Sequence, residues 1–187
     1  MGVATLYRRF PTRADLAAAA AFERNISRYT RAVDRALANR NAWDSFQRLV
    51  FELCEMQAGD AGLRDLLTTA FPASSAVEQR TTEAVEKVKA LIGRAQAEGR
   101  LRPDVVVADV VVMLLANAGV LRATGTSAPD AWRRFAALMV DAFRARPETP
   151  LPPAPPEQQL RGSIALLTEG RRAGPARVDS PGPGRTN

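Results

Sequence analysis

The residue types that most often catalyse reactions or bind metals are scarce in this sequence. It contains no histidine and one cysteine, Cys54, so it lacks the usual general base, the usual zinc ligand and any internal disulfide. Glu52 with Glu55, and Glu83 with Glu86, are acidic pairs at helical spacing, but solvated helix faces explain them without a reaction. Cys54 lies in an apolar run and is expected to be a small buried hydrophobe. We therefore expect no enzymatic activity, no catalytic residues, no metal site and no cofactor.

Positive charge is concentrated near the N-terminus. Residues 1–40 contain eight arginines against three acidic residues, whereas residues 41–146 contain thirteen basic and thirteen acidic side chains. A local excess of arginine is typical of a protein that binds a polyanion, most often nucleic acid. The alternative is that these arginines only solvate helix faces.

The stretch TLYRRFPTRADL, residues 5–16, contains groups suited to phosphate binding. Leu6 and Phe10, four positions apart, can pack inward on one face of a helix, which leaves Tyr7 and Arg9 free to contact phosphate oxygens. The proline and the threonine after it mark the start of a second helix. Arg13 lies in the first turn of that helix, where backbone N–H groups also attract an anion.

The elements that position these residues are helices, because apolar residues recur at helical spacing and strand signals are weak. The fold class is therefore all-α. Helices are expected over residues 13–39, 42–57, 61–71, 75–98, 103–123 and 130–146. Pro103 and Asp104 suit the first turn of the fifth helix, and Gly99 suits the position just after the fourth.

Two other segments bear on location and domain limits. The apolar run 105–120 is shorter than the ~20 residues of a membrane span and contains Asp109 and Asn117, so we expect a buried helix in a cytoplasmic protein that does not enter a membrane. Residues 147–187 hold nine of the thirteen prolines, which predicts a disordered tail. Within the tail, residues 157–170 have the pattern of a short amphipathic helix.

The stretch at 5–16 resembles the end of the DNA-binding domain of TetR-type (TetR/AcrR) transcriptional regulators. In that family a recognition helix ends in Thr-Leu-Tyr-x-x-Phe, and a Pro-(Ser/Thr)-(Lys/Arg)-x-x-Leu turn leads into the next helix. The matching positions are Thr5, Leu6, Tyr7, Phe10, Pro11, Thr12, Arg13 and Leu16. The resemblance implies phosphate contacts from Thr5, Tyr7, Arg9 and Arg13, and apolar contacts near base edges from Val3 and Ala4.

The resemblance also implies a domain organisation. Residues 1–12 are a remnant of the helix-turn-helix head, residues 13–146 form a TetR-like ligand-binding and dimerisation domain, and residues 147–187 form the tail. Family members carry two further helices before this point, so we expect the sequence to be an N-terminally truncated form of a longer protein. These 187 residues alone are then expected to bind specific DNA poorly.

The family binds its inducer among the middle helices, here 42–57, 61–71 and 77–98 with a contribution from 105–123. The candidate lining residues are Trp43, Phe46, Val50, Leu53, Met56, Gln57, Val85, Val88, Leu114 and Asn117, of which Gln57 and Asn117 would orient a ligand. Ordinary core packing is the alternative explanation for each of them.

The last two helices, 105–123 and 130–145, are the expected homodimer interface, because the first is apolar nearly all round. The sequence thus predicts a ligand-responsive repressor whose partners are operator DNA, a small-molecule inducer and a second copy of the chain. The alternative is a dimeric small-molecule-binding or hetero-dimerising helical module without DNA-binding activity.

Overall fold

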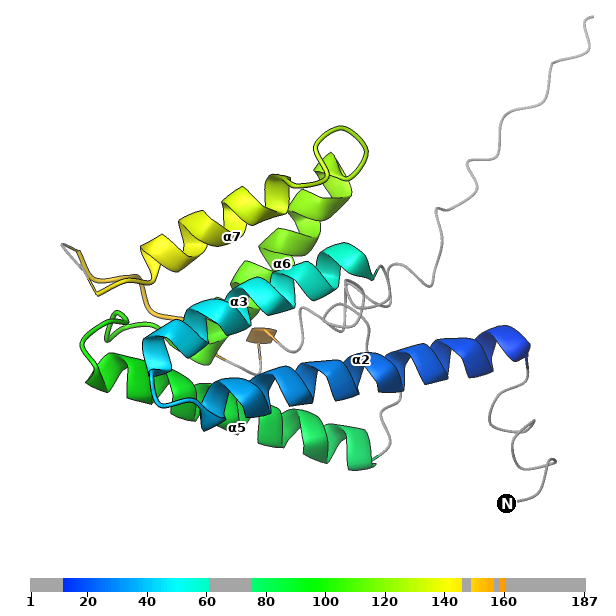
Figure 1. Cartoon of the computed structure of the whole chain (residues 1–187), viewed down its shortest axis with the longest axis horizontal. Helices are drawn as coiled ribbons and strands as arrows, with labels where there is room; N and C mark the ends of the chain where they lie inside the picture. Colours follow the sequence, from blue (N-terminus) through cyan, green and yellow to red (C-terminus); the bar gives the residue numbers. More distant parts are fainter. Residues whose placement is uncertain (1–11, 61–74, 146–148, 157–158, 161–187) are drawn as a thin grey trace, which may run out of the picture.

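The computed structural model describes residues 12–60, 75–145, 149–156 and 159–160, and in this part the chain is a bundle of long helices (Figure 1). The helices are α2 (Arg13–Ala38), α3 (Ala42–Gly59), α5 (Ser75–Ala97), α6 (Val107–Thr124) and α7 (Ala131–Ala142). The described residues form no strand beyond one isolated bridge between Leu101 and Arg144. The all-α prediction is confirmed.

Helix α3 lies at the centre of the bundle. It packs against α2, α5, α6 and α7, while α2 packs along α5 and α6 packs against α7. Figure 1 shows α2 and α5 side by side below α3, and α7 on its other side. Because α3 has neighbours on several sides, ten of its residues are buried. The apolar ones among them are typical of a core formed by one central helix.

The connection between α5 and α6 differs from the prediction. Pro103 and Asp104 do not lie in the first turn of a helix, because α6 begins only at Val107. Gly99 has φ +66°, the left-handed conformation expected just after a helix end. The residues between Gly99 and Val107 form a loop that is held by contacts with side chains outside the loop. A local sequence pattern does not predict such contacts.

The end of α7 also differs from the predicted limit of 145 or 146. The helix stops at Ala142 because the next residues pair with the α5–α6 loop instead. Arg102 N donates to Phe143 O over 3.0 Å, and Ala145 N donates to Arg100 O over 3.0 Å. These two bonds replace those of a further helical turn.

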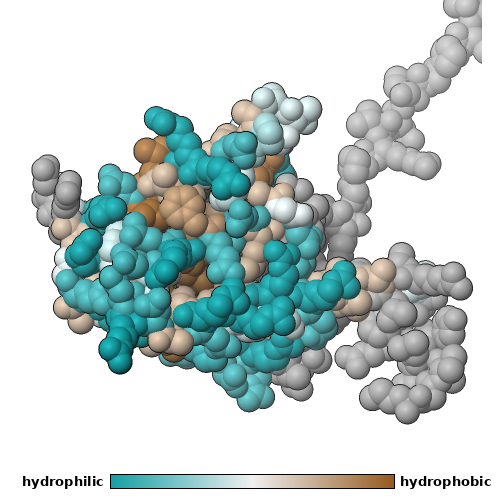
Figure 2. Space-filling model, viewed as in Figure 1, coloured by the Kyte–Doolittle hydropathy of each residue, from teal (hydrophilic) through white to brown (hydrophobic). Residues whose placement is uncertain are grey.

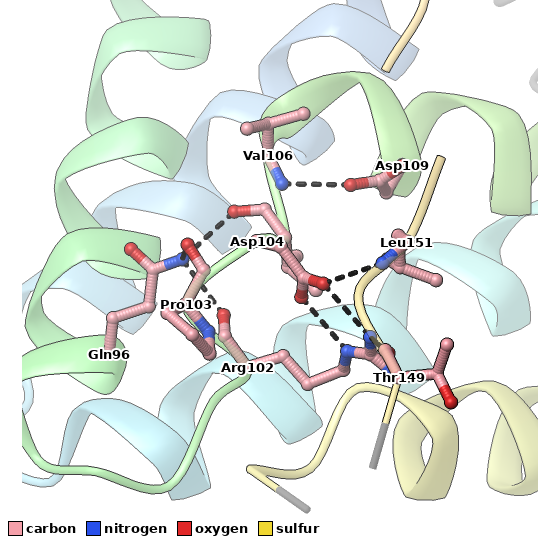
Figure 3. Close-up of polar contacts among 9 residues, drawn as sticks. Gln96, Arg102, Pro103, Asp104, Val106, Asp109, Thr149 and Leu151 are labelled. Atoms are coloured by element: carbon pink, nitrogen blue, oxygen red, sulfur yellow. Dashed lines mark hydrogen bonds and ion pairs between the residues drawn. The ribbon is translucent and has the colours of Figure 1, made fainter. Parts of the chain in front are cut away.

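A segment after α7, residues 149–156, is called here the C-terminal strap. Its residues are exposed, yet it is held to the α5–α6 loop at two points (Figure 3). Arg102 Nη2 donates to Thr149 O over 3.0 Å, and Leu151 N donates to Asp104 Oδ2 over 2.9 Å. The assignment of residues 147–187 to a disordered tail stays a prediction.

Asp104 is the centre of this arrangement. The Arg102 guanidinium donates to both of its carboxylate oxygens over 2.9 Å. This pairing, together with the Leu151 N–H, holds the pKa of Asp104 well below its usual range. On the other side of the loop, Gln96 Nε2 donates to the carbonyl oxygens of Arg102 and Val105 over 2.9 Å each (Figure 3). The loop is thus tied to α5 and to the strap.

Two predicted helices fall on segments that the structure does not cover in full. The helix over 61–71 lies outside the described residues. Of the amphipathic segment 157–170, only Gln159 and Leu160 are described, and both are helical.

Candidate functional site

The DNA-contacting residues predicted from the sequence lie almost entirely outside the described part of the chain. Val3, Ala4, Thr5, Tyr7 and Arg9 precede it. Arg13 is the first residue of α2, which is where the capping pattern predicts the helix to begin, and its side chain lies outside the description. The assignment of these residues to DNA binding stays a prediction.

Helix α2 directly follows the predicted DNA-contacting stretch and is fastened to α5 by charged side chains. Arg80 donates from Nη1 to Glu23 and from Nη2 to Ser27 Oγ, each over 2.9 Å. Lys87 Nζ lies 2.5 Å from Asp34 Oδ1. Pairing with Asp34 is the main reason that the pKa of Lys87 is raised.

On its other flank α2 is joined to α3. Arg35 pairs with Glu52, and Arg28 Nη1 lies 4.0 Å from Asp60 Oδ2 just after the end of α3. Between the two flanks, Ile26 and Val33 are buried against the rest of the bundle. Helix α2 is therefore in direct contact with both α3 and α5.

The turn between α2 and α3 is held by the last turn of α5. Arg94 donates to the carbonyl oxygens of Leu37, Asn39 and Arg40 over 2.6, 2.6 and 3.1 Å, and so satisfies carbonyls left free at the end of α2. Glu98 accepts from the backbone N–H groups of Ala42 and Trp43 over 2.8 and 2.9 Å. These two bonds lower the pKa of Glu98 and cap the start of α3.

The predicted ligand-lining residues are buried in the bundle, apart from Val85, which is half-buried. Most of them belong to one buried hydrophobic core, but within it they span the length of α3. Trp43 and Phe46 stack with ring centroids 6.1 Å apart, and Phe46 meets Phe143 edge-on at 5.8 Å. This aromatic group lies at the start of α3, about 16 Å along the helix from Gln57 at a rise of 1.5 Å per residue.

Gln57, Leu114 and Asn117 are brought together at the other end of α3. Gln57 Nε2 donates to Leu114 O over 3.3 Å, and Asn117 Nδ2 donates to Gln57 Oε1 over 2.9 Å. Gln57 is 1% exposed and Asn117 0%. We call these two side chains the buried amide pair.

The buried amide pair leaves one polar atom without a partner. Asn117 Oδ1 accepts no hydrogen bond within the described structure, and a buried polar atom in that state costs about 1–3 kcal/mol. Ser45 Oγ is buried and unpaired as well, but it lies near the start of α3, about 18 Å along the helix from Gln57. Asn117 Oδ1 is the acceptor that the amide pair presents to the interior.

An open groove on the outside of the bundle contains none of the predicted lining residues. It runs between α3 and the start of α7, where Figure 2 shows apolar surface bordered by hydrophilic residues. Arg133 lies 4.5 Å from the Trp132 ring centroid and 3.7 Å from Glu55 Oε1. The groove is lined by Asp44, Gln47, Arg48, Phe51, Glu52, Glu55, Trp132 and Arg133. Its charges of both signs already pair with one another in part.

Burial also settles the chemistry of Cys54. The thiol is 0% exposed, and desolvation raises its pKa to about 12. It is therefore a thiol rather than a reactive thiolate at neutral pH.

Helix α6 presents an apolar side to solvent. The stretch Val107–Thr124 is long and apolar enough to cross a membrane by composition alone, and 39% of it is buried. Val112 is 45% exposed, and the next turn adds exposed Ala116. In the described part, the exposed large hydrophobic side chains are Val106 at the N-cap of α6, Val112 in α6, Leu138 in α7 and Leu151 in the strap.

Residues 38–145 match the family model of the C-terminal domain of SbtR-like transcriptional regulators. The chain belongs to the TetR family. The structure is similar to the crystal structure of the TetR transcriptional regulator SCO0520 from Streptomyces coelicolor, with 25% identity and a TM-score of 0.50. That similarity covers 77% of this chain and 81% of SCO0520. No curated protein matches the sequence.

The matched family is one of transcription regulators. Within this TetR-family body, sequence reasoning missed the side chains that hold the loops: Arg94, Gln96, Glu98, Arg102 and Asp104. The only local signal is the spacing of Arg94 and Glu98, four residues apart at a helix end. The backbone partners of Arg94 and Glu98 lie more than fifty residues away in the sequence, so a local pattern does not predict these contacts.

Proposed function

We propose that this TetR-family chain belongs to a ligand-responsive DNA-binding repressor that acts as a homodimer in the cytoplasm. The observation that carries the proposal is the attachment of α2. This helix continues from the stretch that resembles a recognition helix, and it is paired on one flank with α5 and on the other with α3.

The attachment suggests how a ligand would act. A molecule bound among α3, α5 and α6 changes their relative positions, and α2 follows because its partners are on α3 and α5. In a two-fold dimer this movement alters the distance between the two DNA-binding heads. The ligand releases DNA to the extent that it binds the altered state more tightly than the DNA-bound state.

The apolar exposed side of α6 supports the homodimer. Residues 111–121 contain no charged side chain, and Val112 and Leu138 are 45% and 55% exposed. An unpartnered apolar surface of this kind is typical of a subunit interface. We place the interface on α6 and α7, within the predicted ranges 105–123 and 130–145.

The dimer is tested by sedimentation velocity at micromolar concentration. Val112→Asp is expected to convert the dimer to a monomer, because it puts a charge into the apolar contact. Thr82→Asp is the matched control, since Thr82 is exposed on α5 and should leave the dimer intact. A wild-type monomer, or an unchanged dimer in Val112→Asp, would contradict this interface.

DNA binding is tested by selection of bound duplexes from a random-sequence pool, with the 187-residue chain and with a form extended by the two helices that TetR-type heads carry before the recognition helix. A repressor should enrich a two-fold symmetric site whose half-sites lie about 34–36 Å apart, with affinity that falls as salt increases. If the extended form is dimeric and binds small molecules but enriches no sequence, the alternative of a dimeric ligand-binding module without DNA-binding activity is supported instead.

A further inference from the structure

The C-terminal strap, residues 149–156, is rich in proline and exposed along its whole length. Proline fixes its own φ near −65° and keeps the residue before it extended. Thr149, Leu151 and Ala154 each precede a proline, as do two of the prolines themselves. These restrictions favour the polyproline II conformation, a helix with three residues per turn.

Three residues per turn give the strap three edges of different composition. Leu151 and Ala154 share one edge, and Pro152 and Pro155 share the next. The third edge carries the remaining prolines: Pro150, Pro153 and Pro156. Two prolines at this spacing, each with an apolar residue before it, are the pattern that proline-rich peptides place into grooves lined by aromatic side chains. Leu151 is 42% exposed, so this surface is open to a partner.

The strap is held to the helical body in a way that leaves its backbone acceptors open. Arg102 and Asp104 bond its first three residues, and the carbonyl of Pro156 accepts from residues that follow it. Within the described structure, the carbonyl oxygens of residues 150–155 accept no hydrogen bond. Tryptophan or tyrosine side chains of a partner can donate to them while both ends stay in place. A segment that is already extended and anchored loses little conformational entropy on binding.

The residues that flank the strap in the sequence are acidic, Glu148 before it and Glu157 after it. The groove between α3 and α7 of a second copy is a poor match, because its lining contains three acidic side chains against two basic ones. Its Trp132 is also buried, at 3% exposed. A groove with lysine or arginine at its ends would instead attract the two glutamates.

We propose that the strap is a docking peptide for a second, different protein, whose binding groove is lined by aromatic side chains and flanked by lysine or arginine. The edges that carry Leu151 and Pro152 enter the groove, and Pro153 points away from it. The interaction brings another protein to the helical bundle. It does not depend on the DNA-binding or ligand-binding function proposed above.

The first test uses an isolated SH3 domain as the probe, because such domains bind this proline pattern in an aromatic groove. Two forms are compared, one with its acidic specificity pocket and one with those acidic residues changed to lysine. In a magnetic resonance titration with the full chain, the lysine form should bind about tenfold more tightly, with shifts in its aromatic groove. No binding by the lysine form, or equal binding by both forms, would overturn the proposal.

The second test changes the strap itself. Pro152→Ala combined with Pro155→Ala removes the edge that enters the groove and should weaken binding to the lysine form by about tenfold. Pro153→Ala is the matched control, since it removes a proline from the edge that points away, and its binding should stay like that of the wild type. All three positions are exposed, so the melting temperature should not change. An equal loss in the control would show that the proline pattern is not what is bound.

The third test distinguishes a different protein from a second copy of this chain. A fluorescent peptide of residues 148–157 is titrated with the wild-type chain. The proposal predicts no saturable binding, because the α3–α7 groove has the wrong charge. Saturable binding would overturn the proposal, since the partner of the strap would then be another copy of the chain.

Discussion

Two polar regions of this bundle differ in how completely their groups are paired. At the α2–α3 turn, Arg94 donates to backbone carbonyl oxygens and Glu98 accepts from backbone N–H groups. Both side chains lie where water can reach them. In the interior, the buried amide pair is closed to water and leaves Asn117 Oδ1 unpaired. A completely paired region is typical of a structural support, whereas an unpaired buried acceptor costs stability.

The largest effect is expected from Gln57→Met. This change removes the partner of Asn117 Nδ2 and leaves the buried Asn117 amide with neither end paired, at a cost of about 1–3 kcal/mol in the free energy of unfolding. Chemical denaturation measures it. Gln47→Met on the half-exposed side of the same helix is the control and should have little effect. A Gln57→Met variant as stable as the control would show that the amide pair is not tightly held.

A smaller loss of stability is expected from Glu98→Gln, because water can replace part of what the carboxylate provides. The folded-state pKa of Glu98 lies below its ordinary value of 4.5, so the carboxylate stabilises the fold above pH 4.5. This contribution is lost as the pH falls through the folded-state pKa. Unfolding of the variant should therefore depend less on pH in the acid range.

The matched control for Glu98→Gln is Glu86→Gln, which changes the same charge on an exposed site of α5. Its pH dependence should remain like that of the wild type. If both variants lose the same amount of acid dependence, the bonds from Glu98 to Ala42 and Trp43 do not stabilise the start of α3.

The smallest effect on global stability is expected from Asp104→Asn. The carboxylate holds the Leu151 N–H of the strap, so hydrogen exchange at Leu151 should become faster while the melting temperature changes little. In the wild type the lowered pKa of Asp104 keeps this bond at pH 3.8, the ordinary value for this group. Asp130→Asn, at an exposed residue, is the control. Unchanged exchange at Leu151 would show that the strap is not held by Asp104.

Local sequence patterns predicted the long helices well. The start of α2 at Arg13 and the glycine after α5 follow from capping residues whose effect is confined to one turn. The start of α6 was predicted wrongly, because Pro103 and Asp104 have the composition of a helix start but are held by Gln96 and by the strap. Such contacts depend on tertiary structure.

The candidate site could be predicted only as a set of residue types. Gln57 and Asn117 stand out in the sequence as amides within apolar helices. Their pairing joins positions sixty residues apart, and the free oxygen follows from the direction of a bond to Leu114 O. Neither is present in a local pattern, and the aromatic group around Phe46, grouped with them by sequence, lies at the other end of α3.

The central claim is that this helical body acts as a homodimer whose interface lies on α6 and α7, where Val112 and Leu138 are exposed. Sedimentation velocity of the wild type and of Val112→Asp at micromolar concentration tests it most directly. The account predicts a dimer for the wild type and a monomer for the variant. A wild-type monomer, or a Val112→Asp variant that remains a dimer, would contradict it.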